Sequence, residues 1–184
     1  MTTPPPTRAS IVSRACRYAL PLILAYTPFG LALGATPAAT HLPPLIAWSS
    51  SPLLFGGAAQ LLAVQLLDTH ANPVVVVLAA LVVNARMLLY SAALAPHTAA
   101  WPARRRWLGA YLLADPVYAL ANNRFHGPHR GSARDRWRYH LTVGLTLWTA
   151  WLTLTAAGVL LGRVLPTSLP TSLGTWLHLD LAAR

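Results

Sequence analysis

The sequence predicts an all-α, polytopic integral membrane protein with about five hydrophobic segments, some of them broken or re-entrant. Hydrophobic residues make up 55% of the 184 residues and charged residues only 10%, whereas soluble domains average about 25% charged residues. The mean hydropathy is +0.47. Apolar runs of the length that crosses a bilayer recur along the chain.

The charges are almost all positive. The 14 basic residues are all arginines and the four acids are all aspartates, which gives a net charge of +10. In a soluble protein this charge would indicate nucleic-acid binding. Here the arginines are concentrated between apolar runs, which is the pattern of the positive-inside rule. We therefore expect contact with membrane lipids, anionic headgroups in particular, and no nucleic-acid partner. The single cysteine, Cys16, excludes an intrachain disulfide.

The first apolar run spans residues 18–35 and follows a proline- and arginine-rich segment, residues 1–17, which we expect to be a flexible basic tail. Arginines before an apolar run also begin cleaved signal peptides, but the later runs require a membrane and Pro21 interrupts this one, so we interpret it as a retained span. Pro28 and Gly30 are predicted to break its helix. Such a break is either an ordinary kink or part of a transport pathway.

The second and third runs, residues 45–67 and 74–95, are each long enough to cross about 30 Å of hydrocarbon. Residues 68–73 connect them through a polar turn. Asn72 followed by Pro73 is a favourable helix start, because an Asn side chain caps the first turn and proline suits its first position.

The fourth run, residues 107–122, is short and carries Asp115 followed by Pro116. Proline disfavours helical geometry in the preceding residue, so we predict a break into two short helices. Residues 123–138 form an arginine-rich loop, which we expect to be cytoplasmic.

The last clear span covers residues 139–162, with Trp148 and Trp151 as predicted interface anchors. We therefore assign residues 18–165 to a transmembrane permease domain and residues 166–184 to a short C-terminal tail.

The positions of the arginines limit the number of crossings. Three clusters, around Arg14, Arg105 and Arg134, share the cytoplasmic side only if even numbers of crossings separate them. Three apolar runs precede the second cluster, and one run lies between the second and the third. Either at least two segments fail to cross fully, as re-entrant helices would, or one cluster lies outside.

Polar residues inside the apolar runs are costly in hydrocarbon and indicate a functional site or a structural pair. Arg86 and Tyr90 share a helix face, as Gly56 and Gln60 do. Two interpretations are open. Arg86 binds a carboxylate bidentately while Asp115 binds an amino group or carries a coupling proton. Alternatively, the two form a buried ion pair that sets helix register, with the amides of Gln60 and Asn84 as interhelical contacts.

Enzyme functions have less support. His126 and His129 have no acid or cysteine placed to complete a metal site, so we predict no metal. Ser49 to Ser51 lacks the context of a catalytic nucleophile, and the chain has no glycine-rich phosphate loop, so we expect no cofactor and no ATP hydrolysis.

Four motifs together resemble the AzlC family, the large subunits of bacterial branched-chain amino-acid exporters. They are PFGLALG (28–34), FGGAAQ (55–60), VNARMLLYSAALAP (83–96) and LLADPVYAL (112–120). The resemblance covers about residues 11–165. It implies a multi-pass inner-membrane permease that works with a small hydrophobic AzlD-type subunit. It also implies outward transport of valine, leucine, isoleucine or analogues, driven by the proton gradient.

The chain departs from the family pattern in two places. The family has an acidic pair where this chain has Asp115 and Pro116, which weakens the case for a relay of two carboxylates. Relatives also continue with further hydrophobic spans beyond residue 180, so we expect a shortened member. This favours the alternative function, a truncated, non-transporting membrane scaffold or assembly subunit.

The resemblance and the residue patterns together assign the site. Asp115 is assigned to proton coupling, and the predicted helix breaks are Pro28, Gly30 and Pro116. The residues assigned to substrate binding are Phe29, Gly57, Gln60, Asn84, Arg86 and Tyr90.

Overall fold

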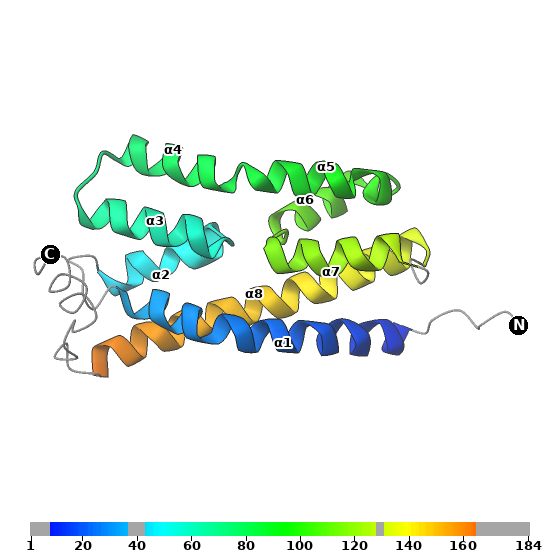
Figure 1. Ribbon diagram of the computed structural model, residues 1–184, viewed down its shortest axis with the longest axis horizontal. Helices are drawn as coiled ribbons and strands as arrows, with labels where there is room; N and C mark the ends of the chain where they lie inside the picture. Colours follow the sequence, from blue (N-terminus) through cyan, green and yellow to red (C-terminus); the bar gives the residue numbers. More distant parts are fainter. Residues whose placement is uncertain (1–7, 37–42, 128–130, 165–184) are drawn as a thin grey trace, which may run out of the picture.

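The computed structural model describes residues 8–36, 43–127 and 131–164, and within these ranges every regular element is an α-helix (Figure 1). Two long helices, α1 (Arg8–Ala35) and α8 (Ala133–Val164), lie side by side. A third rod is made of α4 (Pro73–Asn84) and α5 (Arg86–Thr98). Four short helices complete the bundle: α2 (Pro44–Leu53), α3 (Gly57–Asp68), α6 (Ala103–Tyr111) and α7 (Asp115–His126).

Three helical rods are long and apolar enough to cross a membrane. They comprise residues 9–35, 73–98 and 133–164, which are 27, 26 and 32 residues long. At about 1.5 Å per residue each exceeds the roughly 30 Å of bilayer hydrocarbon. Their outward surfaces carry exposed valines and leucines, as lipid contact requires. The prediction of an all-α membrane protein is confirmed.

The short helices form two hairpins that enter the bundle from opposite ends (Figure 1). Hairpin α2–α3 reverses at residues 54–56, and hairpin α6–α7 reverses at residues 112–114. Their helices have 9 to 12 residues, so each reaches about 14–18 Å, half of the hydrocarbon thickness. The tips of the two hairpins therefore meet near the middle of the molecule.

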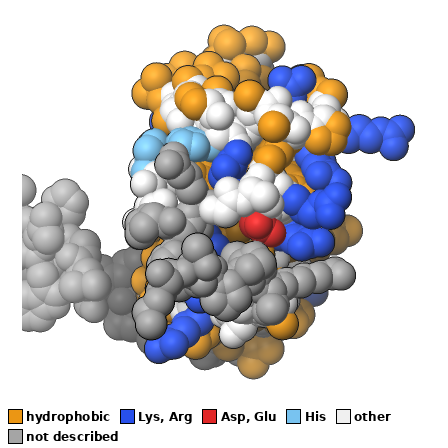
Figure 2. Space-filling view, turned by 90° about the vertical axis from the view of Figure 1, so that its right-hand side faces the viewer, with side chains coloured by type: hydrophobic (Ala, Val, Ile, Leu, Met, Phe, Trp, Pro, Cys, Tyr) orange, Lys and Arg blue, Asp and Glu red, His pale blue; other side chains and the backbone are white. Residues whose placement is uncertain are grey.

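This arrangement places all three arginine clusters at the same end of the bundle. Chain direction in Figure 1 places the start of α1, the start of α6, the end of α7 and the start of α8 at the same end of the bundle. Figure 2 shows arginine side chains gathered on that end. We call it the arginine end; its arginines with described side chains are Arg14, Arg17, Arg104, Arg105, Arg106, Arg124, Arg134, Arg136 and Arg138. Two segments fail to cross, as one of the two alternatives requires, and they are the two hairpins.

Helices α1 and α8 pack together through glycines. The spacing of Gly30 and Gly34 on α1 is that of a small-residue helix-contact motif. A Cβ atom at Gly34 would overlap the carbonyl of Thr155, and one at Gly158 would overlap the carbonyl of Leu31. The two backbones therefore touch directly, and a larger residue at either position would force them apart.

Helix α1 differs from its prediction in two ways. It begins at Arg8, so residues 8–17 are helical rather than a flexible tail, because Ile11 and Ala15 are buried in the main hydrophobic cluster. It also continues unbroken through Pro28 and Gly30. The prediction of helix breaks there is wrong, because Pro28 is exposed on the outer side while Gly30 packs against Leu154 of α8. Residues 1–7 lie outside the described ranges.

Some of the predictions for the other apolar runs are confirmed and others are wrong. Residues 45–67, predicted as one span, are interrupted between Leu54 and Gly56. The break at Pro116 is confirmed. Asn72 caps α4 as predicted, accepting a 2.9 Å bond from the Val74 amide. Trp151 is not an interface anchor, because it is buried, with 6% of its surface exposed. The C-terminal tail, residues 166–184, lies outside the described ranges.

We predict that Gly158→Ala destabilises the protein by roughly 1–3 kcal/mol or more, because the added methyl group meets the backbone of α1. Thermal unfolding in detergent and membrane-fraction yield measure the effect. The matched control is Ala157→Val, which adds bulk at the neighbouring exposed position and should behave as wild type. Equal stability of both variants would contradict the glycine contact.

Candidate functional site

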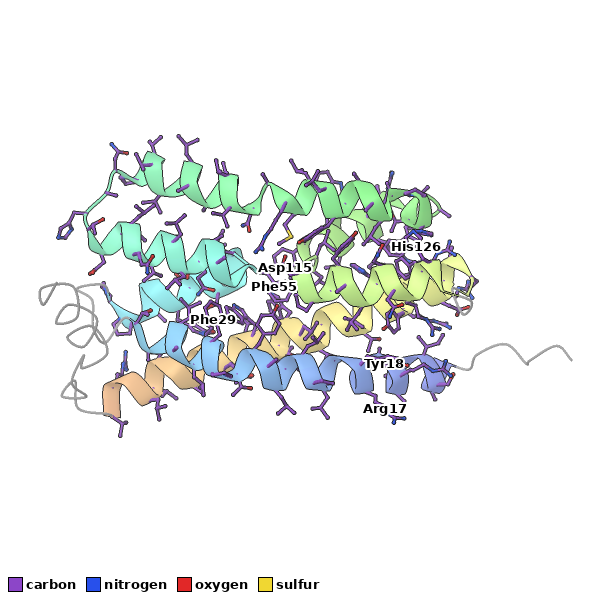
Figure 3. All side chains as sticks on the ribbon, in the orientation of Figure 1. Arg17, Tyr18, Phe29, Phe55, Asp115 and His126 are labelled. Carbon is purple, nitrogen blue, oxygen red and sulfur yellow. The ribbon has the colours of Figure 1, made fainter. Side chains whose placement is uncertain are left out.

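The two hairpin tips enclose a small cavity in the centre of the bundle. It has a volume of about 50 Å³ and is lined by Phe55 to Gly57 of one tip and Ala114 to Pro116 of the other. Tyr26 of α1 and Trp151 of α8 close its sides. Figure 3 shows Phe55 and Asp115 next to each other where the tips meet, with Phe29 nearby on α1. The break between α2 and α3 and the break between α6 and α7 therefore both line this cavity.

Asp115 is the charged centre of the site. Its Oδ2 atom lies 2.9 Å from an Arg86 guanidinium nitrogen, and its Oδ1 accepts a 2.9 Å hydrogen bond from the Tyr90 hydroxyl. Arg86 and Tyr90 stand one turn apart on α5, as the sequence predicted. The Arg86 and Asp115 side chains are 35% and 36% exposed, so the pair is only half-buried. The polar contacts join the rod α4–α5 to the tip of α7.

Tyr90 is held in position by a second aromatic ring. Tyr90 stacks on Tyr118, which lies on α7 one turn after Asp115. The two ring centroids are 4.2 Å apart and the ring planes are at 8°. Stacking adds about 0.5–1.5 kcal/mol to such a contact. The hydroxyl of Tyr90 therefore has a fixed orientation toward Asp115.

Two buried polar atoms near the pair have no partner within the described residues. They are Nε of Arg86 and Oδ1 of Asn84. Asn84 is packed against the first hairpin tip, because a Cβ atom added to Gly56 would lie 2.9 Å from its Oδ1. An unpaired buried donor or acceptor costs about 1–3 kcal/mol. One donor and one acceptor therefore remain for a bound molecule or for water.

A second polar group joins the first hairpin to α8. Buried Gln60 donates a 2.7 Å hydrogen bond to Ser51, and its Oε1 accepts a 3.3 Å bond from the indole of Trp151. The Trp151 ring lies 6.0 Å from the ring of Phe29. Both rings press on Gly57, where a Cβ atom would lie within 3.0 Å of each. This group fixes α2, α3 and α8 relative to one another.

Helix ends contribute to the electrostatics of the cavity. Helices α3 and α7 both begin there, at Gly57 and Asp115. The first turn of a helix presents free amide groups and the positive end of the helix dipole. The site thus combines two positive helix ends, one guanidinium and one carboxylate, which suits a ligand that carries an anionic group.

A larger cavity of about 580 Å³ lies between α5, α6 and α8, toward the arginine end. Its lining includes Ser91, next to Tyr90, and Leu113, two residues before Asp115. Arg106 and His140 also line it. His140 is buried, and its Nδ1 has no partner within the described residues. The cavity therefore lies on the arginine side of Asp115, without including Asp115 in its lining.

The structure brings together only part of the predicted site. Arg86, Tyr90 and Asp115 touch one another, and Asn84 lies against Gly56. Phe29, Gly57 and Gln60 form a second group around Trp151, which meets the first group at the central cavity, where Gly57 and Trp151 line the wall together with Asp115. Sequence reasoning missed Ser51, Tyr26 and Trp151. Their only sequence signal was position within runs that contain other polar residues, and Trp151 was misassigned to the membrane interface.

The fold and the site define an all-α membrane protein with a polar centre. The AzlC family model, described as AzlC protein, matches residues 21–165, so the chain belongs to the AzlC family, which is associated with membrane transport and is not an enzyme family. A relative described as an uncharacterized membrane protein of Haemophilus influenzae is 26% identical over 152 residues. That match covers 83% of this chain and 61% of the relative. No solved structure matches the chain significantly.

We predict that Arg86→Gln lowers membrane-fraction yield, because it leaves the Asp115 carboxylate half-buried without its cation. The expected loss is about 1–2 kcal/mol, below the 3–5 kcal/mol of a fully buried pair. The double variant Arg86→Gln with Asp115→Asn should recover the yield, since both charges are removed together. A double variant as poorly produced as the single one would show that the pair does not stabilise the fold.

Proposed function

We propose that this chain is the large subunit of a secondary exporter for branched-chain amino acids or their analogues, in a bacterial inner membrane. The observation that carries the proposal is the meeting of two opposed half-length hairpins at Asp115, with Arg86 beside it. Transporters commonly place broken helices at mid-depth, where helix ends bind the charged groups of the substrate. Family membership supports the transport class.

The ion pair is matched in charge to an amino acid zwitterion. A substrate carboxylate could take the place of Asp115 on Arg86, using the planar guanidinium and its free Nε. The substrate ammonium would then pair with Asp115. No net charge is left unpaired when the substrate replaces the internal pair. The apolar surfaces of Phe55, Leu147 and Trp151 line the central cavity together with Asp115 and suit a branched aliphatic side chain.

The cavity must enlarge to admit this substrate. Small-molecule pockets generally have volumes of about 300–1,000 Å³, and the central cavity has about 50 Å³. The structure therefore corresponds to a state in which the hairpin tips are closed on each other. The 580 Å³ cavity on the arginine side of Asp115 has the size for substrate to wait before the tips separate.

Asp115 is our candidate for proton coupling. Within the described ranges the other acids are Asp68 and Asp135, which lie at the ends of the bundle. Before substrate binds, protonation of Asp115 would break the ion pair and release Arg86. Asp115 would then lose this proton when the substrate ammonium pairs with its carboxylate. A single carboxylate held by a tyrosine and an arginine replaces the acidic pair expected from the family pattern, since Pro116 follows it.

The proposed partner is a small hydrophobic AzlD-type subunit. The outer surface of α4 and α5 supports a hydrophobic neighbour, because Val74, Val77, Leu81 and Leu88 are more than half exposed. Membrane lipid could cover the same apolar surface. The arginine end would face the cytoplasm.

The alternative, a non-transporting scaffold or assembly subunit, also has an observation in its favour. Arg86 and Asp115 already satisfy each other, and the cavity between the tips is small. A purely structural pair would have these properties. Transport measurements on variants of the pair separate the two functions.

We predict that Arg86→Lys folds normally but weakens amino-acid export, because lysine keeps the charge and loses the bidentate geometry. A lost charge-assisted contact of roughly 1.5–3 kcal/mol corresponds to about a ten- to hundredfold loss of affinity. The measurement is export of labelled leucine from preloaded cells that also express the AzlD-type partner. Export at wild-type rates by the yield-restored double variant Arg86→Gln with Asp115→Asn would show that Arg86 does not contact the substrate.

Asp115→Asn is expected to abolish uphill export while retaining exchange of labelled for unlabelled substrate. The amide oxygen can still accept one of the two hydrogen bonds that Asp115 accepts from Tyr90 and Arg86, but the side chain has no titratable proton. The N-cap of α7 is Ala114 and Asp115 makes no side-chain cap hydrogen bond, so the start of α7 should persist in this variant. Wild-type uphill export by this variant would remove Asp115 from the coupling scheme.

Orientation is tested by cysteine labelling in a Cys16→Ser background. Ser13→Cys at the arginine end should react with an impermeant maleimide only after the cells are permeabilised, and Thr69→Cys at the opposite end should react in intact cells. Both positions are exposed. The reverse pattern would place the arginine end outside.

A further inference from the structure

A third cavity lies at the arginine end, away from the hairpin tips. It has a volume of about 190 Å³ and lies between α1, α7 and α8. Its polar lining comes from all three helices: Arg14 and Tyr18 on α1, Asn123 and Arg124 on α7, and Tyr139 on α8. None of the described residues that line it is acidic. Cationic and neutral hydrogen-bonding groups therefore converge on one space.

The two arginines of this cavity have no acid to neutralise them. The ion pairs among the described residues are Arg86–Asp115 and Arg138–Asp135, and neither involves Arg14 or Arg124. The Arg124 guanidinium lies over the ring of Tyr139, 5.1 Å from its centroid, which fixes it at the cavity wall. Tyr139 itself is buried. The cavity thus holds a fixed cation, a second cation on its rim and no counter-charge.

The cavity is also at the level where hydrocarbon begins. Tyr18 is 52% exposed, and the outer surface of α1 beyond it carries the exposed leucines Leu20 and Leu24. Tyrosine at such a boundary is typical of the membrane interface. Figure 3 shows Arg17 and Tyr18 on α1 near this end of the bundle. An anion that fills the cavity would have a polar end wall and an apolar surface directly beside it.

We propose that this cavity binds the phosphodiester headgroup of an anionic phospholipid. Arg14 and Arg124 contact the phosphate oxygens, and Tyr18 and Asn123 supply neutral hydrogen bonds at the rim. Phosphate oxygens are the acceptors that arginine binds bidentately, and basic pockets between membrane helices bind anionic headgroups. Inorganic phosphate offers the arginines the same oxygens. The exposed leucines of α1 favour the lipid, because they can contact its acyl chains, which a free ion lacks.

Such a lipid would join α1 to the second hairpin. Arg14 is near the start of α1, and Asn123 and Arg124 are near the end of α7, whose other end carries Asp115. The headgroup neutralises the repulsion between the two arginines. Anionic lipid should therefore hold the second hairpin against α1 and α8, independently of what the central site transports.

The test counts lipids bound to the purified full chain by native mass spectrometry. Protein in neutral detergent is titrated with phosphatidylglycerol or with phosphatidylcholine. Wild type should retain phosphatidylglycerol preferentially, and Arg14→Gln with Arg124→Gln should weaken it about tenfold or more. The control, Arg104→Gln with Arg134→Gln, removes the same charge from exposed positions outside the cavity and should leave binding unchanged.

Three results would overturn the proposal: no preference for phosphatidylglycerol in the wild type, an unchanged affinity in the cavity variant, or an equal loss in the control. Millimolar inorganic phosphate is added as a competitor. Complete displacement of the lipid by phosphate would assign the cavity to a soluble anion instead. If the glutamine variant fails to fold, Arg14→Lys with Arg124→Lys replaces it and should bind the lipid more weakly than wild type while still preferring it to phosphatidylcholine.

Discussion

The interruption of helices inside an apolar bundle is the constraint on which this structure depends. Backbone groups released at a helix break cost several kcal/mol in hydrocarbon unless the protein satisfies them. At the first tip, the carbonyl of Pro52 accepts a 2.6 Å hydrogen bond from Tyr111, the last residue of α6. Trp148 in turn donates to the Tyr111 hydroxyl. The second hairpin thus satisfies a carbonyl at the end of α2, next to the break in the first hairpin, and this bond holds the two tips together.

The charges follow from the same geometry. A helix that begins at mid-depth directs its positive end and free amides into the bundle, and a carboxylate at that position is stabilised by both. Asp115 occupies this position on α7. A carboxylate away from water then needs a cation, which Arg86 provides across the gap. The arginine that is costly in a membrane span is therefore a consequence of the broken helix opposite it.

The sequence was most informative where the residues themselves forbid a continuous helix or a buried charge. Asp115 with Pro116 predicted the second break, and Arg86 and Tyr90 predicted a shared face. The arginine clusters allowed two alternatives, at least two incomplete crossings or one cluster on the outside, and the structure has the incomplete crossings. The sequence was least informative where packing against a neighbouring helix determines the local structure. Pro28 lies in an unbroken helix because α8 supports α1, whereas Pro52 lies beside a true break. Trp151 has the sequence position of an interface residue, but in the structure its indole donates a hydrogen bond to Gln60 inside the bundle.

The order of elements has an internal symmetry that no sequence repeat revealed. Hairpin α2–α3 followed by the rod α4–α5 runs in one direction, and hairpin α6–α7 followed by α8 runs in the other (Figure 1). Opposed repeats of this kind place a site at equal depth from both surfaces. The two halves are packed differently, however, since glycines join α1 and α8 beyond the site, near Gly34, while the 580 Å³ cavity lies on the arginine side.

This difference distinguishes the two sides of the central site. With the arginine end in the cytoplasm, the large cavity is on the cytoplasmic side of Asp115 and the backbone contact of α1 with α8 is on the outer side. A substrate could approach the closed tips from the cytoplasm, whereas its release requires movement at the glycine contact. In the proposed cycle the two sides of the site are therefore opened by different movements, separation of the hairpin tips on one side and of α1 from α8 on the other.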